Sequence, residues 1–202
     1  MTAGLLYKCR WRTNQWNYDN NSWDRGWDML LFIGEEPIYR DDGAFLFYNY
    51  RFHDRIAWEV FTQGQHNKVN LINFRGLLGT GPRVKLTNSE NYKFYLGTLA
   101  MFEYEEVDDG VTPLQRNLRG SSYLSFSLYP TERISMVSTT YYQPLFKQFS
   151  DYRISSESSL LVEMFTNFAL KTTYRFIYDA VPAVGIPNSQ YEFTTGITYS
   201  FD

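Results

Sequence analysis

The sequence predicts an all-β chain built from antiparallel strands. Apolar and polar residues alternate with a period of two in one segment after another, which is the pattern of strands and not of helices. Turn-forming residues separate these segments. Several connections are too short for anything but a hairpin, so consecutive strands are expected to be antiparallel neighbours.

The composition excludes several classes of protein. The 202 residues include 16 Phe, 17 Tyr and 5 Trp, an aromatic content that argues against disorder. A net charge of -3 implies no nucleic acid or other strongly charged partner. The mean hydropathy of -0.40 argues against a helical membrane protein. One cysteine, Cys9, and two histidines predict no disulfide and no metal site, and we expect no cofactor.

Ten strands are predicted, with twelve as the alternative. Their ranges are 27–39, 44–53, 55–66, 69–86, 92–106, 117–129, 133–143, 151–166, 167–179 and 189–201. Segment 1–26 has no clean alternation and no apolar signal-peptide core, so it is expected to be an irregular or truncated N-terminal segment. The remainder, 27–202, is expected to form one domain.

Most of these strands carry charged residues on one of their two faces, here called the polar face. The residues that mark it are Arg51 in 44–53, Glu59 in 55–66, Arg75 in 69–86, Glu103 in 92–106, Arg119 in 117–129, Arg153, Glu157 and Glu163 in 151–166, and Lys171 and Arg175 in 167–179. The opposite face of each strand carries Leu, Ile, Val and aromatic residues. In the last strand, Tyr191 and Phe193 share a face with Ile197, opposite Glu192 and Thr194.

The connections are expected to alternate in length. Tight turns are expected at His53-Asp54, 130–132 and 166–167, and longer loops at 107–116, 144–150 and 180–188. Aromatic residues fall near both ends of the strands, as in membrane-interface girdles. This is the anatomy of a single antiparallel up-and-down transmembrane β-barrel, with short periplasmic turns, longer extracellular loops and an even strand number.

The ten charged residues of the polar faces would then line the lumen. They select solutes if the lumen is an open pore, or they fill a small barrel as paired charges, because a buried charge is tolerated only with a partner. The second interpretation is favoured. Glu59, Arg75 and Glu103, on three consecutive strands, are expected to form one ladder of acid, base and acid. The glycines of 76–81 are expected to relieve bending of a curved wall.

Two other classes of function remain open. A soluble lipocalin-like barrel with a ligand inside would need its apolar face turned inward. A lipid-modifying barrel enzyme would need a base beside a nucleophile, and His66 is the candidate at the outer rim. The serines around Glu157 have no histidine at their depth, so no catalytic residue is predicted and the chain is expected not to be an enzyme.

Five segments of the chain resemble the YdiY-like family of salt-induced outer-membrane proteins, a domain of unknown function. They read EVFTQ at 59–63, FRGLLGTGPR at 74–83, YQPLFKQFSDYR at 142–153, SSESSLL at 155–161 and YDAVP at 178–182. The resemblance covers roughly residues 44–201. Family members carry a secretion signal, and residues 1–27 do not show one.

The resemblance implies a location and partners. It implies a protein of the cell envelope in the outer membrane of a Gram-negative bacterium, in contact with outer-membrane lipid. Gly196, Tyr199 and Phe201 look like the C-terminal signal that the barrel assembly machinery recognises, although Asp202 follows them. An envelope or stress-related role, or a narrow porin-like passage for small solutes, is the expected function.

Overall fold

The computed structural model describes residues 5–12, 26–36, 41–68, 70–87, 89, 91–165 and 168–199 of the chain. All of its regular structure in these ranges is β-strand. No helix in this part of the chain is long and apolar enough to cross a membrane.

Eleven strands follow one another along the described residues. They are β1 (Leu5–Arg12), β2 (Gly26–Glu36), β3 (Asp41–His53), β4 (Ile56–Asn67), β5 (Ile72–Lys85), β6 (Tyr92–Val107), β7 (Gln115–Thr131), β8 (Ile134–Leu145), β9 (Gln148–Phe165), β10 (Phe168–Asp179) and β11 (Ser189–Tyr199). Many are longer than the five or six residues usual in soluble proteins. The prediction of an all-β chain is confirmed.

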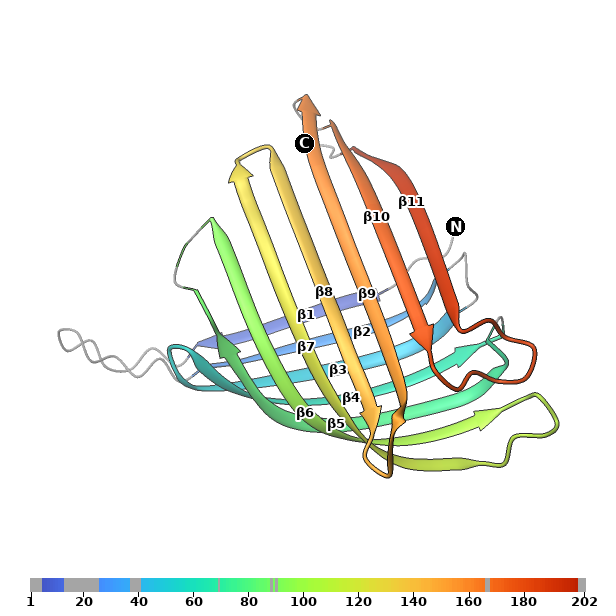
Figure 1. The fold of residues 1–202 in the computed structure, drawn as a ribbon. Helices are drawn as coiled ribbons and strands as arrows, with labels where there is room; N and C mark the ends of the chain where they lie inside the picture. Colours follow the sequence, from blue (N-terminus) through green and yellow to red (C-terminus); the bar gives the residue numbers. More distant parts are fainter. Residues whose placement is uncertain are drawn as a thin grey trace.

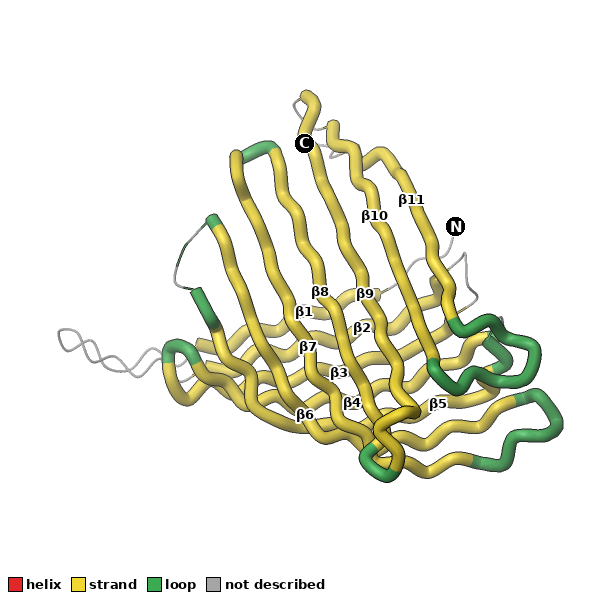
Figure 2. The backbone as a smooth tube through the Cα atoms, viewed as in Figure 1, coloured by secondary structure: helices red, strands yellow, loops and turns green. Residues whose placement is uncertain are grey.

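The strands form a single sheet in which every neighbour in sequence is an antiparallel neighbour in space. The sheet curves, so that β6–β11 lie in front of β1–β5 in the view of Figure 1. The tube in Figure 2 shows the up-and-down path without crossovers. Strands β1 and β11 form the two edges, and no ladder joins them among the described residues.

The predicted strand count is wrong for the described residues. The ten expected ranges correspond to β2–β11, and β1 is an additional strand within the segment expected to be irregular. It was missed although Lys8, Arg10 and Arg12 do alternate with apolar and aromatic residues, because the strand is only eight residues long and a stretch without clean alternation follows it. It pairs with β2 over its whole length, with Cys9 opposite Met29. Residues 13–25 of that segment lie outside the described residues.

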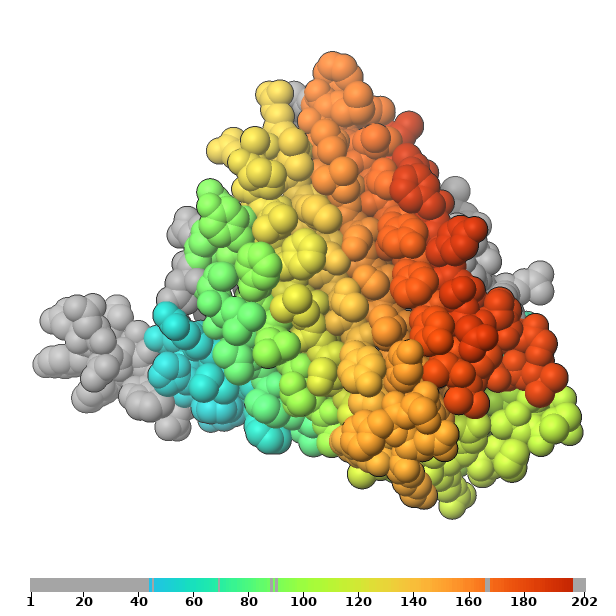
Figure 3. Space-filling view, viewed as in Figure 1, coloured from blue at the N-terminus to red at the C-terminus, as the bar shows by residue number. Residues whose placement is uncertain are grey.

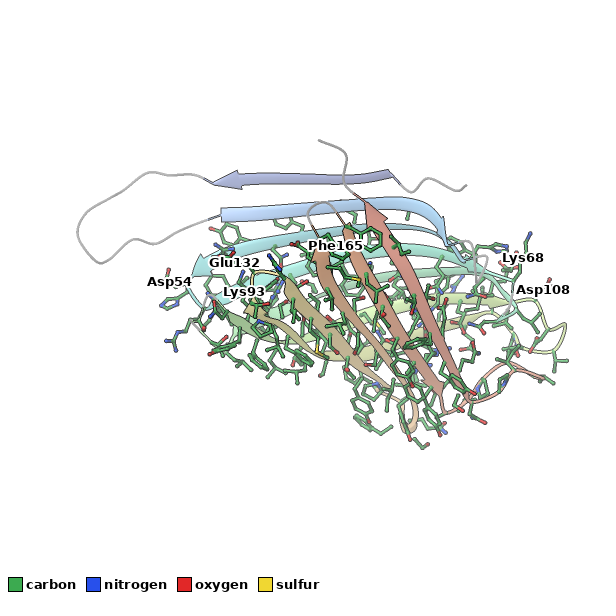
Figure 4. The ribbon with its side chains drawn as sticks, turned by 90° about the horizontal axis from the view of Figure 1, so that it is seen from above. Asp54, Lys68, Lys93, Asp108, Glu132 and Phe165 are labelled. Carbon is green, nitrogen blue, oxygen red and sulfur yellow. The ribbon has the colours of Figure 1, made fainter. Side chains whose placement is uncertain are left out.

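The sheet has a turn end and a loop end. The turn end carries the 54–55 and 132–133 turns, and the loop end carries the connections 108–114 and 180–188. Figure 4 shows Asp54, Lys93 and Glu132 at one end and Lys68 and Asp108 at the other. The predicted contrast between tight turns at one end and longer loops at the other is confirmed only in part. The expected loop at 144–150 is a tight turn at 146–147, because β8 and β9 extend through its residues.

Alternation along the strands gives the sheet two chemically different faces. On the inner face, Glu59, Glu103 and Arg119 are 0, 0 and 1% exposed. On the outer face, Leu78 and Phe102 are 57 and 47% exposed. Figure 3 shows the side chains of β6–β11 covering one side of the molecule. The small core therefore lies inside the curve, and large apolar side chains point away from it.

Candidate functional site: the charged inner face

Glu103 on β6 is the centre of an ion cluster on the inner face. Its Oε1 lies 2.8 Å from Nη2 of Arg75 and 2.5 Å from Nη1 of Arg153. Its Oε2 accepts a hydrogen bond of 2.6 Å from Nε of Arg119. The three arginines come from β5, β9 and β7, so this one carboxylate joins four strands of the sheet.

Three further acids complete this cluster. Glu105 pairs with Arg153 at 2.9 Å and with Arg75 at 3.2 Å. Asp151 pairs with Arg119 at 2.9 Å, and Asp179 pairs with Arg153 at 2.7 Å. We call these seven residues the loop-end network. Its members are Arg75, Glu103, Glu105, Arg119, Asp151, Arg153 and Asp179.

The charged groups of the loop-end network are paired with one another. Three guanidinium groups face four carboxylates, and every member has at least one oppositely charged partner within 3.2 Å. Burial of an ion costs several kcal/mol unless a partner and hydrogen bonds compensate it, which explains why the groups occur together. The network therefore ties strands together across the inner face and presents no bare guanidinium to a solute.

A second cluster surrounds Glu59 on β4. Nη1 of Arg83 lies 3.0 Å from its Oε1, and the hydroxyl of Tyr123 donates a hydrogen bond of 2.5 Å to its Oε2. The guanidinium of Arg83 lies 3.9 Å from the ring centroid of Tyr95, a cation–π contact. Tyr123 in turn packs on Tyr141 with ring centroids 5.3 Å apart. We call Glu59, Arg83 and Tyr123 the Glu59 cluster.

Glycines make room for the aromatic rings of the inner face. A Cβ atom on Gly97 would lie 2.1 Å from Cε1 of Tyr123, and one on Gly79 would lie 2.3 Å from Cε1 of Phe61. Any larger residue at these positions would push the ring away from the wall. Gly79, which was expected only to relieve bending, thus has a specific packing role.

The predicted ladder of Glu59, Arg75 and Glu103 is only half correct. Arg75 does pair with Glu103, but Glu59 pairs with Arg83. The register explains the difference, because Glu59 lies opposite Gly81 while Arg75 lies opposite Gln65, six residues farther along β4. Residues on neighbouring strands can share a face of the sheet and still lie at different positions along the strand direction, too far apart to pair.

The remaining predicted charges lie on the same face outside these two clusters. Glu157 pairs with Arg175 at 3.0 Å, and Arg175 approaches Glu192 at 3.7 Å. Arg51 lies opposite Ala57 and has an interaction of its own. Glu163 lies opposite Ala169, and Lys171 lies opposite Leu161. The described residues show no ion pair for these last two side chains.

Sequence reasoning missed five charged residues that contact the predicted ones: Glu192, which lies near Arg175, and four that belong to the two clusters. Arg83 has the same odd-numbered parity as Arg75, and Glu105 the same as Glu103, so alternation alone was a sufficient signal for both. Asp151 and Asp179 were assigned to strand ends, although they also share the parity of the charged residues on their strands. Their role follows only from the loop-end network, in which each pairs with an arginine.

Polar atoms on the outer face are paired with one another. The hydroxyls of Ser138 and Ser158 lie 2.8 Å apart, and those of Thr140 and Ser156 lie 2.9 Å apart. The indole N–H of Trp58 donates a hydrogen bond of 2.7 Å. Its acceptor is the Thr80 hydroxyl, which donates to the carbonyl oxygen of Glu59. These hydroxyl and indole groups therefore need no water, as an apolar surrounding requires.

Aromatic contacts on the outer face lie toward both ends of the sheet. Toward the loop end, Tyr152 packs between Tyr142 and Tyr178, with ring centroids 5.7 Å away on each side. Toward the turn end, Phe94 stacks on Phe126 at 5.9 Å. An outward apolar face and inward charges are the reverse of what the lipocalin-like alternative requires.

Two other predicted features can be placed. His66 is engaged by the backbone, since its Nδ1 lies 2.5 Å from the carbonyl oxygen of Asn73. Of the C-terminal signal, Gly196 lies opposite Lys171 and Tyr199 opposite Phe168 in the ladder with β10, whereas Phe201 lies outside the described residues. Within the described part of the chain, no group of three or more His, Cys, Asp or Glu is placed to bind a metal ion.

A cavity of about 600 Å³ occupies the inner side of the curved sheet. Residues of β3–β10 line it, and they include both ion-paired side chains such as Arg75 and neutral ones such as Gln63 and Ser155. The loop-end network borders this space through Arg75 and Arg153.

Comparison with known proteins agrees with this architecture. A solved structure described as a NanC porin is similar over 99% of this chain and 94% of its own, with a TM-score of 0.55 and 10% sequence identity. At that identity the similarity shows the fold alone. No curated protein matches the chain. The model of the family described as "Protein of unknown function, DUF481" matches residues 43–201, which confirms the predicted resemblance, and the chain therefore belongs to the DUF481 family.

Proposed function

We propose that this chain is an integral outer-membrane β-barrel protein of a Gram-negative bacterium, without enzymatic activity, whose lumen is narrow and lined by paired charges. The observation that carries the proposal is the orientation of the two faces. Large apolar side chains point outward, while Glu59, Glu103 and Arg119 are buried on the inner face. A soluble protein rarely exposes so many large apolar residues, whereas a lipid-facing wall requires them.

The contacts of the outer face support the same proposal. Hydroxyl groups there bond to one another across neighbouring strands, and aromatic rings gather toward both ends of the sheet. Lipid offers no hydrogen-bond partner, so a wall in contact with it must pair its polar atoms internally. The likeness to a porin structure supports this reading at the level of the fold.

Closure of the sheet is part of the proposal. Strands β1 and β11 run in the same direction, because ten antiparallel steps separate them. A barrel with antiparallel ladders throughout therefore holds an even number of strands, and twelve is the nearest such number above the eleven described. The proposed envelope role is limited passage of small solutes or stress tolerance, with the cavity inside the curve as the route.

Membrane fractionation combined with gel migration tests the proposal. The full-length protein is expected to sediment with the outer membrane and to migrate faster in a detergent gel before heating than after it, as closed barrels do. Conductance across a planar bilayer is then expected to be small and stable. A protein found in the soluble fraction whose migration does not change on heating would overturn the proposal.

A further inference from the structure

Two aromatic rings form an apolar surface on one wall of the cavity. Phe47 on β3 and Phe61 on β4 both line it, with ring centroids 6.5 Å apart and ring planes only 18° from parallel. The missing side chain of Gly79 leaves space for the Phe61 ring against the wall. The result is a pair of stacked rings that gives one wall of the cavity an apolar surface, against which the C–H face of a small ring can pack.

Other walls of the cavity carry neutral hydrogen-bonding groups. Tyr141 and Gln143 of β8 and Ser155 of β9 line the space. Within the described residues, no hydrogen bond occupies the side-chain polar groups of these three residues, whereas the hydroxyl of Thr139 is bonded to Ser125 at 2.9 Å. They are therefore available as donors and acceptors to a molecule in the cavity.

The arginine side chains that line the cavity already form ion pairs within the protein. Arg75 and Arg153 hold Glu103 at 2.8 and 2.5 Å, and Arg175 holds Glu157 at 3.0 Å. An anion would have to displace a carboxylate from one of these guanidinium groups, and a cation would have to displace a guanidinium. Glu103 is fully buried, so displacing either of its guanidinium partners would leave a buried charge without that partner, and this part of the cavity disfavours charged solutes.

We infer that the cavity is a binding site for a neutral polyhydroxylated ring compound, of the kind represented by a small neutral oligosaccharide. The apolar face of such a ring packs on Phe47 and Phe61, and its hydroxyls bond to Tyr141, Gln143 and Ser155. A volume of about 600 Å³ is within the range of small-molecule sites. This inference rests on the proposed function, since it names the class of solute for the same lumen.

Binding of maltotriose to the full-length protein folded in detergent tests the inference, with heat-dependent migration measured first on the same sample. Calorimetric titration is expected to show saturable binding of maltotriose and at least tenfold weaker binding of maltotrionate, the acid of matching length that is formed by oxidation of its reducing end. Phe61→Leu is expected to weaken maltotriose binding about tenfold, and Tyr141→Phe several-fold. The matched variant Phe102→Leu, on the outer face, is expected to bind as the parent does.

Each outcome separates this inference from the proposed function. A heat-modifiable protein that does not bind maltotriose overturns the inference and leaves the barrel intact. Tighter binding of maltotrionate than of maltotriose, or equal binding by the Phe61→Leu and Phe102→Leu variants, also overturns it. A protein whose migration does not change with heat overturns the proposed function, and this inference fails with it.

Discussion

Arg153 on β9 and Glu103 on β6 meet across the inner face, with 2.5 Å between Nη1 and Oε1, although β7 and β8 separate their strands in the sheet. A contact between strands that are not neighbours requires the sheet to curve. Arg153 also holds Glu105 and Asp179, so a single guanidinium joins β6, β9 and β10. The curvature and the charge pairing therefore depend on each other.

Replacing Arg153 with methionine is expected to lower the free energy of unfolding by about 3 kcal/mol. That is the lower part of the range for breaking a buried ion pair, because Glu103 keeps Arg75 and Arg119 as partners. Urea titration of the folded protein in lipid vesicles measures the change. The matched variant Arg133→Met, in the exposed turn after β7, is expected to unfold as the parent does. Equal losses in both variants would contradict a bracing role for Arg153.

Replacing Gly97 with alanine is expected to cost about 1 to 3 kcal/mol, as overpacking does in a tightly packed core. The new methyl group would lie 2.1 Å from the ring of Tyr123, so the ring must move and its hydrogen bond to Glu59 is lost. Gly64→Ala is the control, because its nearest neighbour is Phe74 at 3.9 Å. Unfolding midpoints in urea are compared. A Gly97→Ala variant as stable as Gly64→Ala would show that the ring can shift freely.

Replacing Leu78 with arginine distinguishes an outer face that contacts lipid from one that contacts water. Leu78 is already more than half exposed, so in water the change would cost within about 0.5 kcal/mol. In a bilayer an arginine near the midplane of a barrel wall costs about 2 to 4 kcal/mol. Refolding into vesicles measures the difference. Val111→Arg, in the 108–114 connection, is expected to have little effect, and equal effects of both variants would contradict the proposed orientation.

The 108–114 connection contains a carboxylate held by backbone and hydroxyl donors. Asp109 accepts hydrogen bonds from the N–H groups of Val111 and Thr112 at 3.0 and 2.7 Å and from the Thr112 hydroxyl. These bonds lower the pKa of Asp109 from its ordinary value of 3.8 to about 2, with the Thr112 hydroxyl as the largest cause.

The sign of the resulting pH dependence follows from that lowered pKa. The bonded carboxylate stabilises the connection fully above its ordinary pKa, and the stabilisation is lost as the pH falls through about 2. Amide-proton exchange at Val111 and Thr112 is therefore expected to lose protection between about pH 4 and pH 2. The Asp109→Asn variant is the control, and an unchanged acid-induced loss of protection in that variant would exclude Asp109 as its origin.

Much of the fold was predictable because strands β3–β11 alternate cleanly and their connections contain turn-forming residues. The membership of the inner face was predictable for the same reason, since parity alone assigns Arg75, Glu103 and Arg153 to one side. The partners were not predictable from parity. Arg153 meets Glu103 only because the whole sheet curves, and Glu59 meets Arg83 only because of the register between β4 and β5.

The loop-end network also imposes an order on assembly. Arg119 and Glu103 are 16 residues apart in the chain and can meet as soon as β6 and β7 pair, whereas Arg153 and Glu103 are 50 residues apart and must wait for β9. Closing the longer loop costs more chain entropy, so the Arg153–Glu103 pair is expected to form after the Arg119–Glu103 pair. The bonds of Arg153 therefore mark a late stage of folding: the β6–β7 hairpin can form without them, whereas they require β6 to β9 all to be in place.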